Sequence, residues 1–165
     1  MPISHFLKKY LYVQTFYLTL LLSMEQEHTT YCGCLYYSAN ALSRVITKMA
    51  EEEFAAVGLA PSYAFVLMGV NKKPGIQPKE ISEYMQLTPS TVTRLVEKLE
   101  YKGMVTRKTQ GRATEVYPTP KSLALDAQIR EAWRSLYLRY TGIMGEAPAQ
   151  QLTADIYAAA LKLDE

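Results

Sequence analysis

The sequence contains little cysteine: two of its 165 residues are cysteines, Cys32 and Cys34, and one glycine separates them. Two cysteines this close cannot form the disulfide framework of a small secreted domain, and such usage indicates a reducing compartment. They are also too few to hold a structural zinc ion without other ligands. We therefore expect a cytoplasmic protein without a metal site.

The signatures of an enzyme are also missing. The sequence shows no Ser, His and Asp constellation, no paired-carboxylate spacing and no glycine-rich phosphate-binding loop. Its two histidines, His5 and His28, have no partners at the spacing of metal ligands, and we assign them no role. We expect no catalytic residues, no cofactor and no enzymatic activity.

Charge is present but unevenly distributed. Residues 72–121 hold ten of the eighteen Lys and Arg residues but five of the sixteen acidic residues, so this segment carries +5 in a chain of net charge +2. Basic charge concentrated in one segment is typical of a surface that binds phosphates. The distribution therefore favours a nucleic-acid partner.

Residues 77–117 predict two helices followed by a β-hairpin. The first helix covers 77–85, Gln86 and Leu87 form the turn, and the second helix runs from Pro89 to about residue 101. Thr88 is a good N-cap for the second helix, because its hydroxyl can accept a hydrogen bond from a free backbone N–H of the first turn. Pro89 suits the first helical position, because the N–H that proline lacks would be unpaired there. Two strand-like runs, at 104–108 and 113–117, then flank a predicted turn at 109–112.

Helix, turn, helix and basic hairpin is the sequence form of a winged helix-turn-helix, a fold that binds DNA. A recognition helix enters the major groove by its N-terminal end, where free backbone N–H groups attract phosphate. Its polar face is centred on Ser90, Arg94 and Glu97. We expect Arg107, Lys108 and Arg112 to cluster at the tip of the hairpin, with Lys108 for phosphate and Arg112 for the minor groove. The predicted DNA-binding residues are Ser90, Thr91, Thr93, Arg94, Lys98, Lys108 and Arg112. The simpler alternatives are a well-capped amphipathic helix and a solvated hairpin.

Further helices are predicted at 31–57 and 61–70, before the helix pair, and at about 120–140 and 148–163 after the hairpin, with a break at 142–145. Leu123 and Trp133 are plausible core positions of the helix at 120–140. The acidic run at 51–53 is most simply a solvated patch, and residues 71–75 form a loop. The expected fold is mainly α with a small β-hairpin wing. We assign 61–118 to the winged helix-turn-helix core, and 24–60 and 119–165 to dimerisation helices. These helices carry more apolar surface than a small winged core can cover.

The string from Thr91 to Arg107, with Ile81 to Leu87 upstream, resembles the MarR-type winged-helix transcription regulators (multiple antibiotic resistance regulators). The resemblance covers about residues 31–163. It implies a homodimer that binds a pseudo-palindromic operator in double-stranded DNA. The sequence departs from the family at Gln110, where the wing usually carries an aspartate that orients the wing arginine.

The resemblance also implies a repressor that a small lipophilic or phenolic molecule releases from DNA. Tyr36 and Tyr37 on the first helix and Tyr63 on the second are candidate ligand-binding residues, because tyrosine offers a flat apolar face with one polar tip. Ordinary packing in the core or at an interface is the alternative for each of them. Cys32 and Cys34 are candidates for a redox sensor, against the simpler interpretation of small buried residues near a helix start.

Residues 1–23 differ in character from the rest, with two lysines followed by a mostly apolar run at 10–22. That run is shorter than the roughly 20 residues of a membrane span, and no good cleavage site follows it. Three interpretations stay open: an upstream extension before a functional start at Met24, an added apolar helix on the dimerisation region, or a membrane or export signal. A DNA-binding protein of the cytoplasm argues against the last of these, and a membrane partner is not expected.

Two other functions compete with the DNA-binding regulator. One is a winged-helix module for protein–protein assembly without DNA, and the other is a regulator that senses oxidants through Cys32 and Cys34. The cations of the predicted recognition face favour DNA over the first of these.

Overall fold

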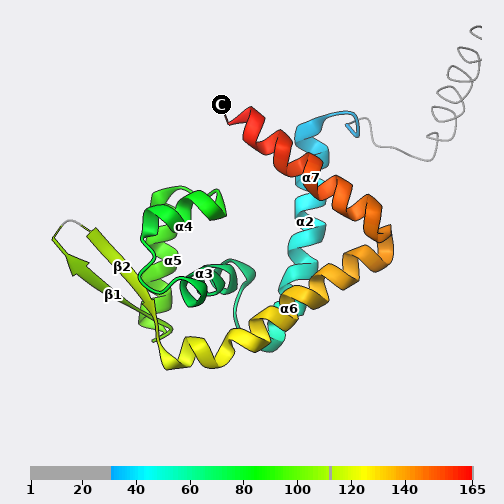
Figure 1. The fold of residues 1–165 in the computed structure, drawn as a ribbon. Helices are drawn as coiled ribbons and strands as arrows, with labels where there is room; N and C mark the ends of the chain where they lie inside the picture. Colours follow the sequence, from blue (N-terminus) through cyan, green and yellow to red (C-terminus); the bar gives the residue numbers. More distant parts are fainter. Residues whose placement is uncertain (1–30, 112, 165) are drawn as a thin grey trace, which may run out of the picture. The chain divides into compact units, whose positions relative to one another are not determined.

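The computed structural model describes residues 31–111 and 113–164, and the interpretations of residues 1–23 lie outside this range. The fold is mainly helical with one antiparallel hairpin, which confirms the predicted class (Figure 1). In chain order its elements are α2 (Leu35–Phe54), a 3-10 turn (Ala55–Val57), α3 (Pro61–Lys72), α4 (Pro78–Met85), α5 (Pro89–Tyr101), β1 (Val105–Gln110), β2 (Ala113–Pro118), α6 (Pro120–Met144) and α7 (Glu146–Leu163).

The chain divides within α2 into two compact units, one ending at Ile46 and the other beginning at Thr47. In the first unit α2 begins at Leu35, four residues later than predicted, because a turn closed by the Cys34 N–H on the Tyr31 carbonyl (2.9 Å) precedes it. The second unit contains the end of α2, the predicted winged core and the two closing helices.

Helix α3 is the centre of the second unit, where it contacts α4, α5, α6 and β2. Ala64, Val66, Leu67 and Val70 are buried in it completely, and Phe54 at the end of α2 packs edge-on against Phe65. Among the described residues no single helix is long and apolar enough to cross a bilayer, although α2 with its 3-10 turn and α3 pass that test as a bent pair.

The predicted helix-turn-helix is confirmed in its local chemistry. Gln86 ends α4 in the left-handed conformation at φ 51°, and the Leu87 N–H donates to the Ser82 carbonyl (3.1 Å). Thr88 caps α5, since its Oγ1 accepts from the Thr91 N–H (3.3 Å). Val92, Val96 and Leu99 of α5 are buried against the core.

The hairpin has a tighter turn than the sequence predicted. Thr109 pairs with Thr114 and Gln110 with Ala113, so both residues belong to the ladder and Gly111, at φ 62°, starts a two-residue turn. The side chain of Gln110 and all of residue 112 lie outside the described part. The sequence pattern did not predict that Thr109 and Gln110 belong to the strand, because Thr and Gln are compatible with either a strand or a loop.

An ion pair fastens the hairpin to α5. Arg107 donates through Nε (2.8 Å) and Nη2 (2.6 Å) to Glu100, and its backbone N–H donates to the other carboxylate oxygen of Glu100 (3.2 Å). Val105 and Val116 are buried below this pair, and Ile76 forms a bridge with Val116 at the base of the hairpin. The expectation that Arg107 belongs to the tip of the wing is therefore wrong, because strand alternation turns it toward α5.

Helices α6 and α7 form a helical hairpin that differs from the prediction in two respects. The break occurs at Gly145 alone (φ 85°), since α6 continues through Gly142. Leu123 and Trp133 are about half exposed (52% and 51%) although both were predicted to lie in the core. The 3.6-residue pattern identified the helix, but its apolar stripe is wider than the face that α3 covers.

The acidic run at the end of α2 is also more than a solvated patch. Arg139 of α6 donates to Glu52 (2.7 Å) and to Glu53 (3.0 Å), so it joins the last turn of α2 to the middle of α6. These two contacts lie within the second unit. They hold the end of α2 on α6, and α3 begins a few residues later.

Gly69 allows Tyr84 of α4 to lie flat on α3, where its hydroxyl donates to the Phe65 carbonyl (2.9 Å). A Cβ at Gly69 would stand 2.7 Å from Tyr84 Cζ, whereas a Cβ at Gly142 meets no atom within 4 Å. We predict that Gly142→Ala raises the free energy of unfolding by about 0.5–1 kcal/mol, as for an unhindered helical glycine. Gly142→Ala is the control for Gly69→Ala, whose free energy of unfolding should be lower than that of the control by about 1–3 kcal/mol, measured by urea unfolding. Equal effects of the two substitutions would show that Tyr84 does not pack as described.

The pair of Glu100 and Arg107 makes the stability of the fold depend on pH. The hydrogen bonds from Arg107 hold the pKa of Glu100 below its ordinary value of 4.5. Since the folded pKa is the lower one, the pair stabilises the fold above that ordinary value and loses its contribution as pH falls through the folded pKa.

Glu100→Gln should therefore lower the free energy of unfolding at neutral pH, and the deficit should shrink in acid below the usual glutamate range. The exposed Glu51→Gln, on α2, is the control. Urea unfolding at the two pH values measures both variants. A deficit for Glu100→Gln that is the same at both pH values would contradict the ion pair.

Candidate nucleic-acid interface

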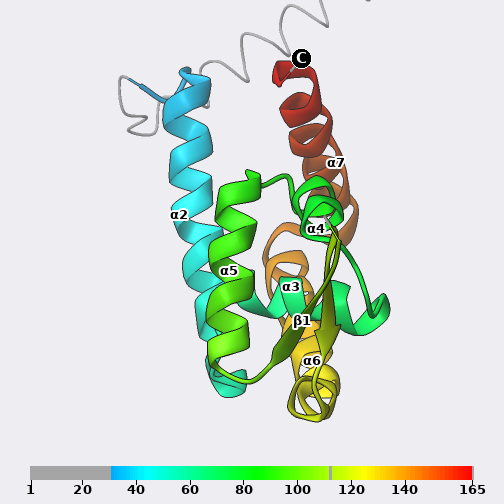
Figure 2. The same ribbon diagram turned by 90° about the vertical axis from the view of Figure 1, so that its left-hand side faces the viewer.

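The second unit presents one side of α5 to solvent, with the hairpin beside it (Figure 2). The buried side of α5 faces the core, and its opposite side is exposed throughout. Five of the predicted DNA-binding residues lie on this exposed side: Ser90, Thr91, Thr93, Arg94 and Lys98. The structure therefore brings them together on one helix face.

The hydroxyls at the start of α5 form an ordered cluster. Thr88 Oγ1 lies 3.1 Å from Ser90 Oγ and 2.8 Å from Thr91 Oγ1, and Thr93 Oγ1 donates to the Pro89 carbonyl (2.9 Å). Each exposed hydroxyl keeps capacity for a further hydrogen bond. The first turn of α5 therefore offers short, pre-positioned polar groups beside free backbone N–H groups.

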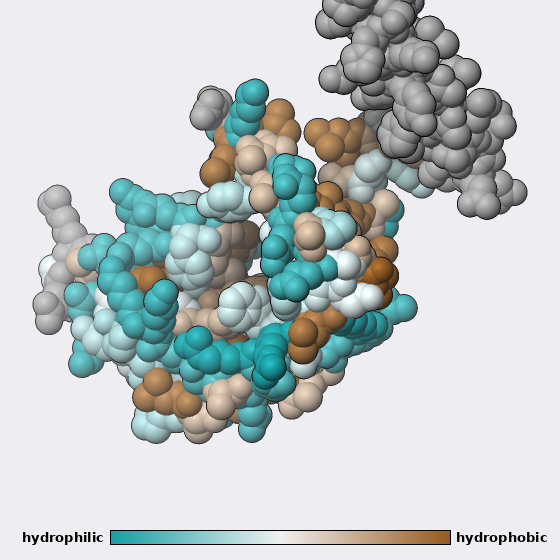
Figure 3. Space-filling model, turned by 45° about the vertical axis from the view of Figure 1, so that its right-hand side comes forward, coloured by the Kyte–Doolittle hydropathy of each residue, from teal (hydrophilic) through white to brown (hydrophobic). Residues whose placement is uncertain are grey.

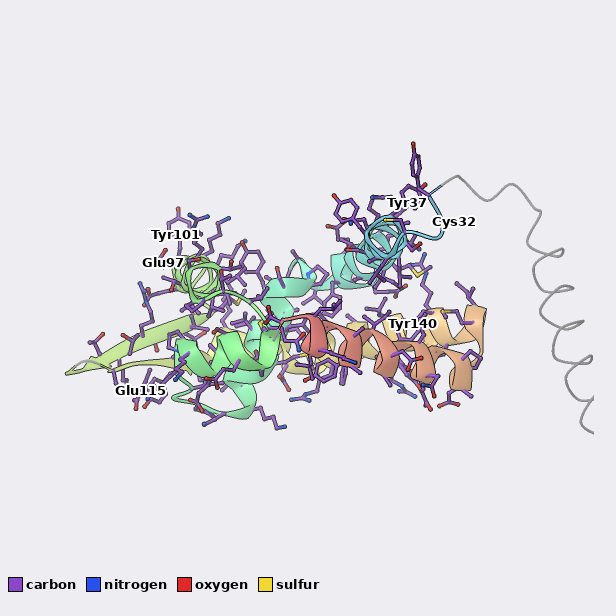
Figure 4. The ribbon with its side chains drawn as sticks, turned by 90° about the horizontal axis from the view of Figure 1, so that it is seen from above. Cys32, Tyr37, Glu97, Tyr101, Glu115 and Tyr140 are labelled. Atoms are coloured by element: carbon purple, nitrogen blue, oxygen red, sulfur yellow. The ribbon has the colours of Figure 1, made fainter. Side chains whose placement is uncertain are left out.

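The cations of this face differ in their availability. Within the described residues no acidic side chain pairs with Arg94 or Lys98, whereas Arg107 is held by Glu100 and lies 3.9 Å from Glu97. Glu97 and Tyr101 point outward from α5 in Figure 4, and Tyr101 is 95% exposed. A long arginine and a lysine are thus free on the helix face, while a third cation holds the wing against it.

Lys108 lies on the other face of the hairpin. Its Nζ is 4.7 Å from the centre of the Tyr117 ring, and Glu115 is its cross-strand partner. The Tyr117 hydroxyl donates to Glu115 (2.7 Å), which raises the pKa of that tyrosine. Figure 4 shows Glu115 on the opposite side of the hairpin from Glu97 and Tyr101. Lys108 is exposed but shares its surroundings with a carboxylate, and Arg112 lies outside the described residues.

The three tyrosines named as candidate ligand-binding residues have different environments. In the first unit Tyr36 is 79% exposed, and the ring of Tyr37 lies 5.9 Å from that of Tyr31. In the second unit Tyr63 is partly buried and packs against the core. None of the three lines the grooves between α4 and α7, between α3, α4 and α6, or between α6 and α7.

Cys32 and Cys34 lie in the exposed turn before α2, so the expectation that they are small buried residues is wrong. The Ser38 hydroxyl donates to the Cys32 carbonyl (2.8 Å) and fixes this turn against the first turn of α2. Because the cysteines precede the helix, its geometry does not force their thiols apart. In the described ranges no group of three or more metal-ligating side chains converges.

Sequence reasoning did not find several residues that position the interface. Arg107 and Glu100 lie in different elements, so the helical i, i+4 spacing cannot reveal their pair. Asn71, which accepts from the Ser122 hydroxyl (2.7 Å) and donates to Asp126 (2.9 Å), looked like an ordinary loop residue before Gly75. Only the packing of α3 on α6 brings these side chains together.

Comparison with known proteins agrees with this geometry. The model of the MarR family matches residues 57–113. The HTH-type transcriptional repressor MdtR of Bacillus subtilis (strain 168) is 33% identical over 70 residues, which make up 42% of this chain and 45% of that relative. The aligned segment thus spans less than half of the curated relative.

Solved structures share the fold over most of the chain. CouR from Rhodococcus jostii RHA1, bound to p-coumaroyl-CoA, has a TM-score of 0.68 at 17% identity and covers 81% of this chain and 96% of its own. S. aureus MepR, in complex with DNA, has a TM-score of 0.67 at 16% identity and covers 78% and 97%. The winged core is thus similar in sequence to the MarR family, and the solved structures show that the fold extends over most of the chain.

Proposed function

We propose that this protein is a transcription regulator that binds a pseudo-palindromic DNA operator as a homodimer. The observation that carries the proposal is the exposed face of α5, where capped hydroxyls, Arg94 and Lys98 lie together beside a wing fastened by Arg107. A face of this kind fits the major groove by its N-terminal end. The remaining cations, Lys108 among them, suit the phosphate backbone.

The side chains on this face divide into two roles. Arg94 is one helical turn into α5 and long enough to bond a guanine edge with two hydrogen bonds. Ser90, Thr91 and Thr93 let the backbone come close to a phosphate, and Lys98 and Lys108 supply charge. Arg112 is our candidate for the minor groove. Residues 61–118 form the DNA-binding core in this proposal.

Dimerisation follows from the apolar surface of α7. Its exposed seam has 37% to 58% of each large side chain accessible in the single chain, and comprises Leu152, Ile156, Tyr157 and Leu161. Figure 3, in which the side of α6 and α7 comes forward, shows apolar surface among polar surface there. A seam of this extent is typical of a helix that is covered by a partner. We assign 24–60 and 119–165 to the dimer.

The sign and the signal of regulation also belong to the proposal. The relative MdtR is a repressor, and the structural neighbour CouR was solved bound to p-coumaroyl-CoA. Both support a cytoplasmic repressor that responds to a small molecule with an apolar part. The alternative, a protein-interaction module that does not bind DNA, has no need of the free cations on α5.

The DNA-binding face is tested by Arg94→Ala. Loss of a bidentate base contact should weaken binding to the specific operator by about 1–3 kcal/mol, roughly 5- to 150-fold, and relax the preference for sequence at one position. Binding titrations on the operator and on random DNA, at several salt concentrations, measure this. Unchanged operator binding would sink the proposed recognition face.

Two variants make the result specific. Lys108→Ala should weaken operator and random DNA alike and make the salt dependence shallower by about one unit, as for a phosphate contact. Arg134→Ala, an exposed cation on α6, should leave both unchanged. If Arg134→Ala weakened binding as much as Arg94→Ala, total charge rather than the α5 face would govern affinity.

The dimer is tested by Ile156→Asp in the middle of the apolar seam of α7. A buried, unpaired carboxylate at a dimer interface is strongly unfavourable, so this variant should sediment as a monomer and lose operator binding while it keeps its helical circular dichroism. Ala158→Asp, on the polar side of the same helix, is the matched control. A dimeric Ile156→Asp protein with intact operator binding would place the dimer interface elsewhere.

A further inference from the structure

The outer face of the wing, turned away from Arg107, carries three polar side chains. Lys108 of β1 pairs with Glu115 of β2 in the register of the hairpin, and Tyr117 lies two residues further along β2. Residues that are opposite each other on two strands, or two apart in one strand, project from the same face of a sheet. Lys108, Glu115 and Tyr117 therefore form one group, which we call the outer-face cluster.

Lys108 and Glu115 are opposite charges at neighbouring positions, yet they do not pair. Opposite charges that face each other across two antiparallel strands usually attract each other. Among the described residues, however, Lys108 takes part in no ion pair, and its Nζ lies 4.7 Å from the centre of the Tyr117 ring. Glu115 accepts a hydrogen bond from the Tyr117 hydroxyl instead (2.7 Å). Tyr117 thus holds the two charges apart, with its hydroxyl on the carboxylate and its ring against the ammonium group.

The loop before α4 helps to fix the position of the Tyr117 ring. Gly75 has a positive φ of 86°, and its N–H donates to the Val116 carbonyl (2.9 Å), so this loop is fastened to β2. A Cβ at Gly75 would stand 3.2 Å from the Tyr117 hydroxyl oxygen and 3.3 Å from its Cζ. The half-buried ring therefore lies close against Gly75 as well as against Lys108. Its place is set in part by the loop, independently of the two charges.

A cation held by an aromatic ring differs from a cation held by a carboxylate. The ring attracts the ammonium group through its electron-rich face and occupies no particular N–H group, so the donors of Lys108 stay available to an oxygen ligand. A carboxylate would occupy one or two of these donors and offset the charge that attracts a phosphate. Arg107 illustrates the second case, because Glu100 binds its Nε and Nη2. The exposed Lys108 illustrates the first.

We propose that Tyr117 is a positioning residue for DNA binding, because it keeps Glu115 away from Lys108 and so leaves that lysine ready to contact a phosphate of the DNA backbone. Without the hydroxyl, Glu115 turns to its cross-strand neighbour, and a phosphate first has to displace it. Tyr117 acts through Lys108 and does not itself contact DNA. The inference rests on the proposed function, since Lys108 contacts phosphate only if the winged core binds DNA.

Removal of the Tyr117 hydroxyl tests this role. Tyr117→Phe keeps the ring and its place beside Gly75, but should weaken binding to the operator and to random DNA alike by about two- to fivefold, the effect of an exposed ion pair that has to be broken. Glu115→Gln should bind at least as tightly as the wild type. The double variant Tyr117→Phe with Glu115→Gln should recover the affinity of Glu115→Gln alone. Binding titrations at one fixed, low salt concentration measure all four proteins.

The recovery has to come from the carboxylate beside Lys108 and not from a lower negative charge in general. Glu131→Gln removes an exposed carboxylate of α6, which lies 3.9 Å from Arg134, and should not restore binding by Tyr117→Phe. A Tyr117→Phe protein that binds DNA like the wild type would overturn the positioning role. Weakened binding that Glu115→Gln fails to restore would overturn it too, because Tyr117 would then act through packing alone. Equal restoration by Glu131→Gln would have the same consequence.

A measurement without DNA separates this inference from the proposed function. A double-mutant cycle of Lys108→Gln and Glu115→Gln, followed by urea unfolding, gives the coupling between the two charges. The coupling should be larger in the Tyr117→Phe background than in the wild type, because only there is the carboxylate released to the ammonium group. Equal coupling in both backgrounds, with DNA binding intact, would refute the positioning role and retain the proposed function. If the protein bound no DNA at all, the proposed function would fail and the role of Tyr117 in DNA binding would fail with it, whatever the coupling.

Discussion

The burial of α3 is the constraint on which the rest of the second unit depends. This helix contacts α4, α5, α6 and β2, and Lys72 at its end is its one exposed residue. A short helix buried on nearly all sides fixes the positions of its neighbours, since close-packed interiors transmit any displacement. The exposed face of α5 is therefore set indirectly, by the core side chains on which α5 rests.

Polar contacts refine this arrangement at three joints. Arg107 and Glu100 fix the wing on α5, Asn71 and its partners fix α3 on α6, and Arg139 fixes the end of α2 on α6. The contacts of Asn71 and Arg139 join elements that are distant in sequence, whereas Arg107 and Glu100 lie seven residues apart in neighbouring elements. The two arginine pairs are partly accessible to water. Partly solvated ion pairs contribute modestly to stability but restrict geometry, and they respond to competing charges. This combination suits the proposed DNA-binding face, which has to be both well positioned and adjustable.

The sequence predicted the helix-turn-helix well because its signals are local. Thr88 followed by Pro89 acts within a few residues, and the structure confirms the helix that begins there. Predictions that needed a partner element did less well. Trp133 and Leu123 are exposed because α3 covers a narrower stripe of α6 than the apolar pattern suggests, and Arg107 turns toward Glu100 instead of the wing tip. The assignment of DNA contacts to individual side chains remains a prediction.

The central claim is that two copies of the α5 face meet DNA together. Hydroxyl-radical and methylation-interference footprinting of the purified protein on a genomic operator tests this most directly. Two protected major-groove segments on one side of the duplex, about 34 Å or roughly one helical turn apart, are expected for a two-fold symmetric pair of recognition helices. Protection of a single segment, or two segments separated by a distance unrelated to the helical repeat, would contradict it.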